Sequence, residues 1–124
     1  MENTLQHTVV DIIGAGLAGS EAALQLAKRN IKVRLFEMRP AVSTPVHKTG
    51  NCAELVCSNS LKSTKPESAA GMLKSELSAL GSYVLSCAWS NRVAAGGALA
   101  VDRDEFSAAV TKLIDENPCI ERIN

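Results

Sequence analysis

The fold is decided by residues 9–23, which read VVDIIGAGLAGSEAA. The apolar run 9–13 enters a G-x-G-x-x-G turn made by Gly14, Gly16 and Gly19, and an alanine-rich helix follows. A second apolar run, 32–36, ends on the acidic residue Glu37. A strand, this turn, a helix and an acid roughly 20 residues later are the pattern of a dinucleotide-binding βαβ unit. The sequence therefore predicts the first part of a Rossmann-like, doubly wound α/β fold with a parallel sheet.

The three glycines have separate physical roles in such a turn. Gly14 permits the tight turn, Gly16 leaves room for a pyrophosphate to approach the backbone, and Gly19 lets the helix lie close to the strand. The helix presents unpaired N–H groups and the positive end of its dipole to the phosphates. The residues expected to contact the cofactor here are Gly14, Ala15, Gly16, Leu17, Ala18 and Gly19.

Two charged residues after the second strand complete the predicted nucleotide site. Glu37 can accept hydrogen bonds from a ribose diol and would repel a 2′-phosphate, which favours the adenosine half of FAD or NAD over NADP. Arg39 is a candidate for neutralising the pyrophosphate, and a solvated charge in a loop explains it equally well.

Composition sets limits on the class of protein. The chain has 124 residues, of which 46% are hydrophobic, and its 13 basic and 13 acidic residues give no net charge. This length suits one domain, and the balanced charge gives no electrostatic indication of nucleic-acid binding. No apolar run is long enough to cross a membrane, and the polar start 1–4 lacks the order of a signal peptide, so we expect a cytoplasmic protein.

The four cysteines are spaced in a way that matches no common zinc site, so no metal is expected. The interpretation from residue type alone is that each is a small buried hydrophobic residue, reduced in the cytosol. These residues are Cys52, Cys57, Cys87 and Cys119.

Periodicity and turn residues predict the order of elements along the chain. The expected order is a βαβ unit at 8–37, a loop at 38–51, a helical insert at about 52–93, a helix at 103–116 and the start of a third strand at 119–123. In the insert we expect a short helix at 52–61 and a longer one from Pro66, capped by Ser63 or Thr64. Asp102 with Glu105 predicts a helix cap.

The predicted sheet has the strand order 3-2-1, with the first strand almost continuously apolar as if buried on both faces. In a doubly wound sheet the first strand is central. We therefore expect the chain to be the front part of a longer protein, with the rest of the domain missing.

Further segments are more distinctive than the glycine turn. They read FEMRP at 36–40, TPVH at 44–47, ELVCSNSL at 54–61 and AGGALAVDR at 95–103. In this order they closely resemble the N-terminal part of the TrmFO family, the folate- and FAD-dependent tRNA (uracil-5-)-methyltransferases of bacteria. The resemblance covers nearly the whole chain after residue 8. Two positions depart from the family pattern: Cys52 replaces an aromatic residue, and Ala95 replaces a proline.

The resemblance implies a glutathione-reductase-like FAD domain and a definite chemistry. The family takes a one-carbon unit from methylenetetrahydrofolate and places it on carbon 5 of the T-loop uridine of tRNA. Reduced FAD, regenerated by NAD(P)H, supplies the electrons. Cys57 corresponds to one of two catalytic cysteines, which act as nucleophile and proton acceptor, and either role remains open for it. The second would lie beyond Asn124, so the chain alone is expected to be inactive.

Two other interpretations stay open at this stage. The first is the related flavoprotein that modifies the wobble uridine of tRNA, which shares the glycine turn but lacks the ELVCSNSL run. The second is a small nucleotide-binding module or a non-catalytic remnant. The sequence does not define an oligomeric state.

Overall fold

The computed structural model describes residues 8–124, so the polar start of the chain at 1–4 lies outside the described residues. Three parallel strands form the first sheet: β1 (Val9–Ile13), β2 (Lys32–Phe36) and β6 (Ile120–Ile123). Their order is β1-β2-β6, with Val10 opposite Val33 and Val33 opposite Ile120. The predicted order 3-2-1 is confirmed, and the fold is a Rossmann-like α/β arrangement.

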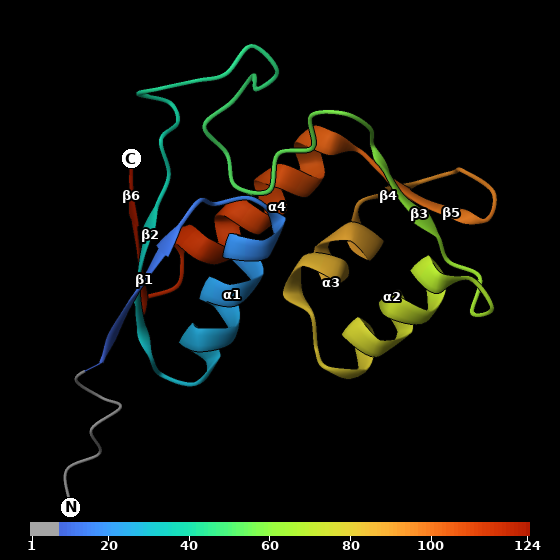
Figure 1. The fold of residues 1–124 in the computed structure, drawn as a ribbon, viewed down its shortest axis with the longest axis horizontal. Helices are drawn as coiled ribbons and strands as arrows, with labels where there is room; N and C mark the ends of the chain where they lie inside the picture. The colour runs from blue at the N-terminus through green and yellow to red at the C-terminus, as the bar shows by residue number, and fades with distance from the viewer. Residues whose placement is uncertain (1–7) are drawn as a thin grey trace, which may run out of the picture.

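Two helices cover the same face of this sheet, as Figure 1 shows. They are α1 (Leu17–Lys28) and α4 (Arg103–Asp115). Leu35 of β2 and Phe106 of α4 are both fully buried in the core between them. The cap predicted for α4 is confirmed, because the Asp102 carboxylate accepts a hydrogen bond from the Glu105 amide at 3.0 Å.

The expectation that the first strand is buried on both faces is wrong for the described chain. Val9 is 50% exposed and Ile13 is 83% exposed. The reason is that α1 and α4 lie on one side of the sheet, so that alternate β1 residues face away from both helices. On this outer face Asp11 forms an ion pair with Arg34 of β2 at 2.7 Å.

The predicted helical insert contains a second sheet, which the sequence reading missed. It consists of β3 (Ser60–Ser63), β4 (Arg92–Val93) and β5 (Ala98–Val101), in the antiparallel order β3-β5-β4. Gly96, with a φ of +61°, lies in the turn that joins β4 to β5. The helix expected at 52–61 is therefore also wrong, because this stretch is irregular and then enters β3.

Two helices pack beside the second sheet: α2 (Ala69–Ala79) and α3 (Tyr83–Ser90). The start of α2 differs from the prediction, because Ser68 caps it by accepting a hydrogen bond from the Gly71 amide at 3.0 Å. Neither Ser63 nor Thr64 is the cap. Pro66 lies before the helix rather than in its first turn.

A carboxylate of α1 joins this helix to the beginning of α3. Glu21 accepts hydrogen bonds from the Ser82 hydroxyl and from the amides of Tyr83 and Val84, at 2.8–2.9 Å. These donors form the beginning of α3, where an acidic group is favourable because the amides of a helix N-terminus are unpaired. Glu21 is thus a cap supplied from a different helix.

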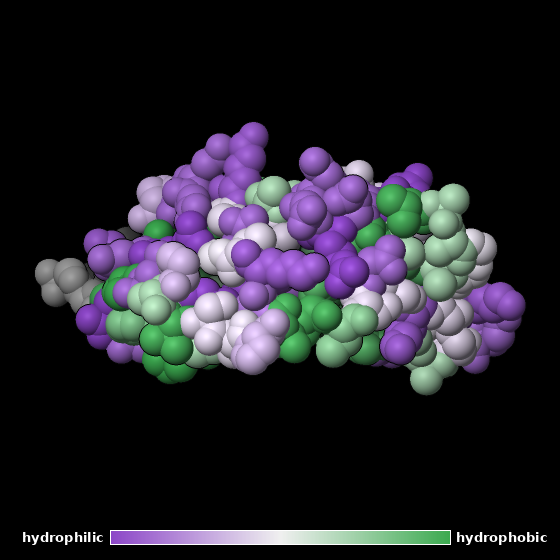
Figure 2. All heavy atoms as spheres, turned by 90° about the horizontal axis from the view of Figure 1, so that it is seen from above, coloured by the Kyte–Doolittle hydropathy of each residue, from purple (hydrophilic) through white to green (hydrophobic). Residues whose placement is uncertain are grey.

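Seen from above, the surface carries hydrophilic and hydrophobic residues interspersed, as Figure 2 shows. Across residues 8–124, every helix is too short or too polar to span a lipid bilayer.

Candidate nucleotide-binding turn and the Cys57 segment

The glycine turn has the geometry that its sequence predicts. Gly14 has a φ of +97°, a conformation that favours glycine, and its amide donates to the Phe36 carbonyl at 2.7 Å. A Cβ atom on Gly19 would overlap the Gly14 carbonyl oxygen, so the close approach of α1 to the turn needs glycine there. A Cβ atom on Gly16 would meet nothing within 4 Å. The space in front of Gly16 is therefore open.

The first turn of α1 offers unpaired amides on the same side. Gly16 is the N-cap residue of α1 and provides no side chain to cap it. Leu17 and Ala18, the first residues of the helix, are exposed. The first amides of a helix have no partner within the helix, and together with the dipole they form a site for phosphate oxygens. These residues fit the pyrophosphate of a dinucleotide cofactor.

Both the backbone amide and the backbone carbonyl group of Ala15 form hydrogen bonds. Its amide donates to Oε2 of Glu37 at 3.0 Å, and its carbonyl oxygen accepts from the Ala53 amide at 2.8 Å. The Ser20 hydroxyl also donates to this carbonyl oxygen, at 3.2 Å. Ala15 thus fixes the turn to β2 and to the segment that leads to Cys57.

Glu37 lies at the carboxyl end of β2, beside the turn, and is only 8% exposed. Burial by itself would raise the pKa of its carboxyl group. Hydrogen bonds from Arg39 and from the Ala15 amide outweigh burial and lower this pKa to about 2. Glu37 is therefore ionised at neutral pH.

The turn and Glu37 line a cavity of about 490 Å³. Phe36, Met38 and Ile123 give this cavity apolar walls, and His47 reaches it from the loop after β2. His47 is half-buried and its Nδ1 lies 2.6 Å from the Thr44 hydroxyl. An apolar cavity next to a carboxylate and a row of amides suits an adenosine group joined to a diphosphate.

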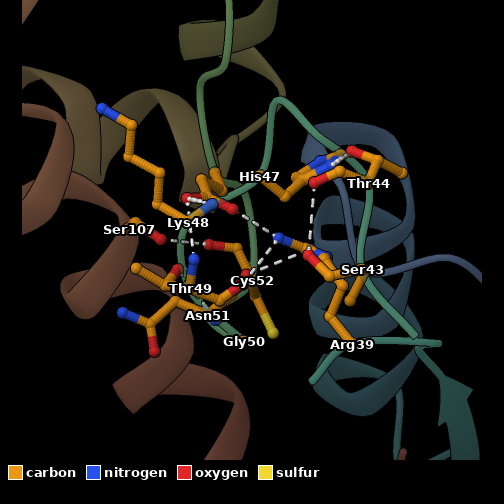
Figure 3. Close-up of polar contacts among 12 residues, drawn as sticks. Arg39, Ser43, Thr44, His47, Lys48, Thr49, Gly50, Asn51, Cys52 and Ser107 are labelled. Atoms are coloured by element: carbon orange, nitrogen blue, oxygen red, sulfur yellow. Dashed lines mark hydrogen bonds and ion pairs between the residues drawn. The ribbon is translucent and has the colours of Figure 1, made fainter. Parts of the chain in front are cut away.

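Arg39 is not a solvated loop charge, because it is only 3% exposed. Its Nε donates to Oε1 of Glu37 at 3.0 Å, and its Nη1 donates to Oε2 of Glu54 at 2.6 Å. Nη1 and Nη2 also donate to the carbonyl oxygens of Thr49 and Asn51, both at 3.2 Å. Figure 3 shows the guanidinium group pointing toward this part of the loop.

The segment 52–54 is anchored to α4 as well as to the turn. The Cys52 amide donates to the Thr111 hydroxyl at 2.8 Å, and the Ser107 hydroxyl donates to the Cys52 carbonyl oxygen at 2.7 Å; Figure 3 shows the second of these contacts. Ala53 is fully buried with a φ of +53°. These contacts hold the backbone three to five residues before Cys57.

Cys57 itself is exposed and lies in the irregular stretch before β3. Val56 and Asn59, on either side of it, line a second cavity of about 610 Å³, which also includes Glu54 and Arg103. Cys57 is therefore accessible to solvent and is close in sequence to two residues of this cavity.

The other cysteines lie in more enclosed places. Cys52 and Cys87 are buried, and burial raises the pKa of both thiols. Cys119 is half-buried. Within residues 8–124 there is no group of three or more side chains of the metal-binding types His, Cys, Asp and Glu that could hold a metal ion.

Comparison with known proteins places the chain in a family. The family described as Glucose inhibited division protein A (GIDA) matches residues 9–124. The chain belongs to the GIDA family. The resemblance inferred from the sequence motifs is also confirmed, because the similar curated proteins carry the name TrmFO.

Two of these relatives illustrate the similarity. A Magnetococcus marinus protein named methylenetetrahydrofolate–tRNA-(uracil-5-)-methyltransferase TrmFO is 60% identical over 115 residues. A Streptococcus pneumoniae protein of the same name is 56% identical over 117 residues. The matches cover 92% and 94% of this chain and 26% of each relative. The chain thus spans about a quarter of the length of these relatives.

The sequence reading missed the residues that support the site from a distance. Glu54 gave no signal, because its ion pair with Arg39 joins residues 15 positions apart in an irregular loop. Ser107 and Thr111 did leave a trace in the sequence, because they are polar residues four positions apart beside the apolar residues Phe106, Val110 and Ile114 on the buried face of α4. Buried hydroxyl groups need hydrogen-bond partners, and here the backbone of Cys52 is one of them.

Proposed function

We propose that this chain forms the FAD-binding part of an enzyme that methylates carbon 5 of the T-loop uridine in tRNA. The observation that carries this proposal is the 60% identity to a TrmFO protein over 92% of the chain. The open glycine turn and the adjacent cavity support the cofactor part of the proposal independently.

The turn and Glu37 have separate tasks in holding the ADP half of FAD. Backbone amides between Gly16 and Gly19 bind the diphosphate, which comes close to the main chain because Gly16 has no side chain. Glu37 accepts from the ribose hydroxyls, since each carboxylate oxygen has more than one acceptor direction. When bound, reduced FAD supplies the electrons that convert the transferred methylene group to a methyl group.

Cys57 is the catalytic residue of this chain in the proposal. Carbon 5 of uracil is a poor nucleophile, and a thiolate that adds to the neighbouring ring carbon makes it reactive. The proton on carbon 5 must also be removed once the new bond has formed. Cys57 performs one of these two tasks. Two observations support this assignment: Cys57 is exposed, and Val56 and Asn59, which are close to it in the chain, line the second cavity.

The remaining components of the proposal come from the resemblance to TrmFO. Methylenetetrahydrofolate is the carbon donor, NAD(P)H is the reductant, and tRNA is the macromolecular partner. By the same resemblance, the proposed chemistry uses a second catalytic cysteine, and Cys52, Cys87 and Cys119 are not proposed for that role. We propose the cytoplasm as its location, because its substrate in this proposal is tRNA.

The test is deletion of the gene that encodes this chain, followed by mass spectrometry of nucleosides from purified tRNA. We expect the T-loop uridine to lose its 5-methyl group in the deletion strain. A wild-type copy of the deleted gene should restore methylation, and a copy with Cys57→Ala should not. A Cys87→Ala copy is the matched control, because Cys87 lies away from the second cavity and should restore methylation.

Other outcomes would favour the alternatives. Loss of wobble-uridine modification with an intact T-loop would identify the related tRNA flavoprotein instead. If both modifications persist while the purified chain still binds FAD, the chain is a nucleotide-binding module without this activity.

A further inference from the structure

Arg39 is placed as a crosslink rather than as a ligand of the diphosphate. The guanidinium group has five N–H donors, and four contacts to protein oxygens already engage it. The side chain is 4% exposed, which leaves almost no surface for a phosphate oxygen. Its charge is balanced by two carboxylates, those of Glu37 and Glu54.

Each of these carboxylates organises a different part of the site. Glu37 accepts the amide of Ala15 in the glycine turn at 3.0 Å. Glu54 accepts the amides of Lys48 and Thr49 in the loop, at 2.9 and 3.1 Å. Arg39 therefore stands between the turn that faces the diphosphate and the loop that leads to Cys57.

We propose that Arg39 is a positioning residue that holds the Glu37 carboxylate toward the ribose and, through Glu54, holds the loop before Cys57. This assignment rests on the proposed function for the roles of the ribose and of Cys57. A planar guanidinium suits the task because it donates in two directions at fixed angles, which an ammonium group does not.

The ionisation of Glu37 gives a readout that separates positioning from simple stabilisation. Arg39 is the positive group in direct contact with Glu37. The other titratable groups near it are His47, which lines the same cavity, and Cys52, whose thiol is affected by the charges of Glu37, Arg122 and Asp115. His47 is the histidine among them and faces the same cavity as Glu37. The experiment is therefore done in a His47→Gln background.

The experiment measures the affinity of the purified chain for FAD by calorimetry between pH 5 and pH 7.5. In the parent protein we expect an affinity that is independent of pH, because Glu37 stays ionised throughout this range. Arg39→Met removes the positive group, so the Glu37 carboxyl takes up a proton more readily, and we expect affinity to fall further at pH 5 than at pH 7.5, by about twofold or more. Arg39→Lys should restore most of the pH independence.

A loss of affinity by the same factor at every pH would overturn the assignment, because a direct diphosphate ligand or a purely structural residue predicts that result. Unchanged affinity in Arg39→Met would overturn it as well. Circular dichroism of each variant separates these results from unfolding.

A second measurement keeps the proposal testable if Arg39→Met does not fold. Glu54→Gln leaves the contact between Arg39 and Glu37 in place. It weakens only the contacts of Glu54 with Arg39 and with the amides of Lys48 and Thr49. We expect hydrogen exchange at the Lys48 and Thr49 amides to rise by about tenfold or more while FAD affinity stays within about twofold. Unchanged exchange at these amides would contradict the claim that Arg39 holds the loop through Glu54.

If the parent chain does not bind FAD at all, the proposed cofactor site fails. Hydrogen exchange at Ala15, Lys48 and Thr49 in Arg39→Lys still tests the crosslink in that case. The proposed role of Arg39 predicts faster exchange at the Ala15 amide in the turn and at the Lys48 and Thr49 amides in the loop. Exchange rates equal to those of the parent protein would contradict this role.

Discussion

The α-carbon of Gly19 lies so close to the carbonyl oxygen of Gly14 that no side-chain atom fits between them. The two residues belong to the same turn, one at its start and one inside α1. Their contact fixes how the helix leaves the strand, and it leaves Gly16 facing open space. Packing and ligand access are thus assigned to different glycines.

This contrast predicts opposite effects for two similar substitutions. Gly19→Ala should destabilise the fold by ~1–3 kcal/mol, because the new methyl group overlaps the turn. Gly16→Ala should leave thermal unfolding almost unchanged and weaken FAD binding by about tenfold or more, because its methyl group occupies the space needed by the diphosphate. Thermal unfolding and FAD calorimetry measure the two effects. Equal stability losses in both variants would contradict this division.

Thr111 is predicted to stabilise the segment before Cys57. Thr111→Val removes the acceptor of the buried Cys52 amide without a large change in volume. Leaving a buried donor unpaired costs about 1–3 kcal/mol. Urea unfolding should show this loss, and Thr111→Ser, which keeps the hydroxyl, should recover most of it. Equal stability of the Val and Ser variants would show that the hydrogen bond contributes little.

Glu21 predicts a pH dependence of stability. Burial alone would raise the pKa of its carboxyl group, but hydrogen bonds from Gln25, Val84, Tyr83 and Ser82 lower it below the ordinary value of 4.5. A lowered pKa in the folded state means that the stabilisation is present above pH 4.5 and is lost as pH falls below it. In Glu21→Gln this acid-dependent part should be reduced, and stability at pH 7 should fall by ~1–2 kcal/mol. Denaturant unfolding at pH 7 and pH 3.5 measures both changes. An equal loss of unfolding free energy between pH 7 and pH 3.5 in the parent protein and in Glu21→Gln would contradict the prediction.

Cys57 should be the first cysteine to react with iodoacetamide in the native chain. It is exposed, whereas Cys52 and Cys87 are buried and burial raises the pKa of their thiols. Because alkylation needs an accessible thiolate, we expect Cys57 to be modified at least about tenfold faster than Cys52. Peptide mass spectrometry at timed intervals gives the rates. Similar rates for Cys52 and Cys57 would indicate that the segment opens readily in solution.

The βαβ unit could be predicted from sequence because its signals are local. The turn needs Gly14 and Gly19 within six residues of each other, and the strands on either side are short apolar runs. The order of the three parallel strands follows the doubly wound pattern, in which the second and third strands are added outward on one side of the first. Only the exposure of β1 differed, because alternating burial depends on which face the helices cover.

The stretch 52–61 could not be predicted because its conformation depends on distant partners. The Cys52 amide finds its acceptor on Thr111, 59 residues later, and Ala53 adopts a positive φ where its amide meets Ala15. Residue preferences along the stretch carry no trace of these contacts. The same reason explains why Arg39 could be identified as a candidate residue while its two carboxylate partners could not.

Glu21, a residue of α1, caps the N-terminus of α3. This contact limits which segments can be exchanged between relatives to make chimeric proteins. An exchange of the segment 58–101 between relatives would keep a properly started α3 only if the incoming segment offers Glu21 a hydroxyl and two amides in the same places. A crossover point between residues 21 and 82 separates these partners. A chimera with a crossover point in this range should therefore fold well only when both parent proteins have Glu at position 21 and Ser at position 82.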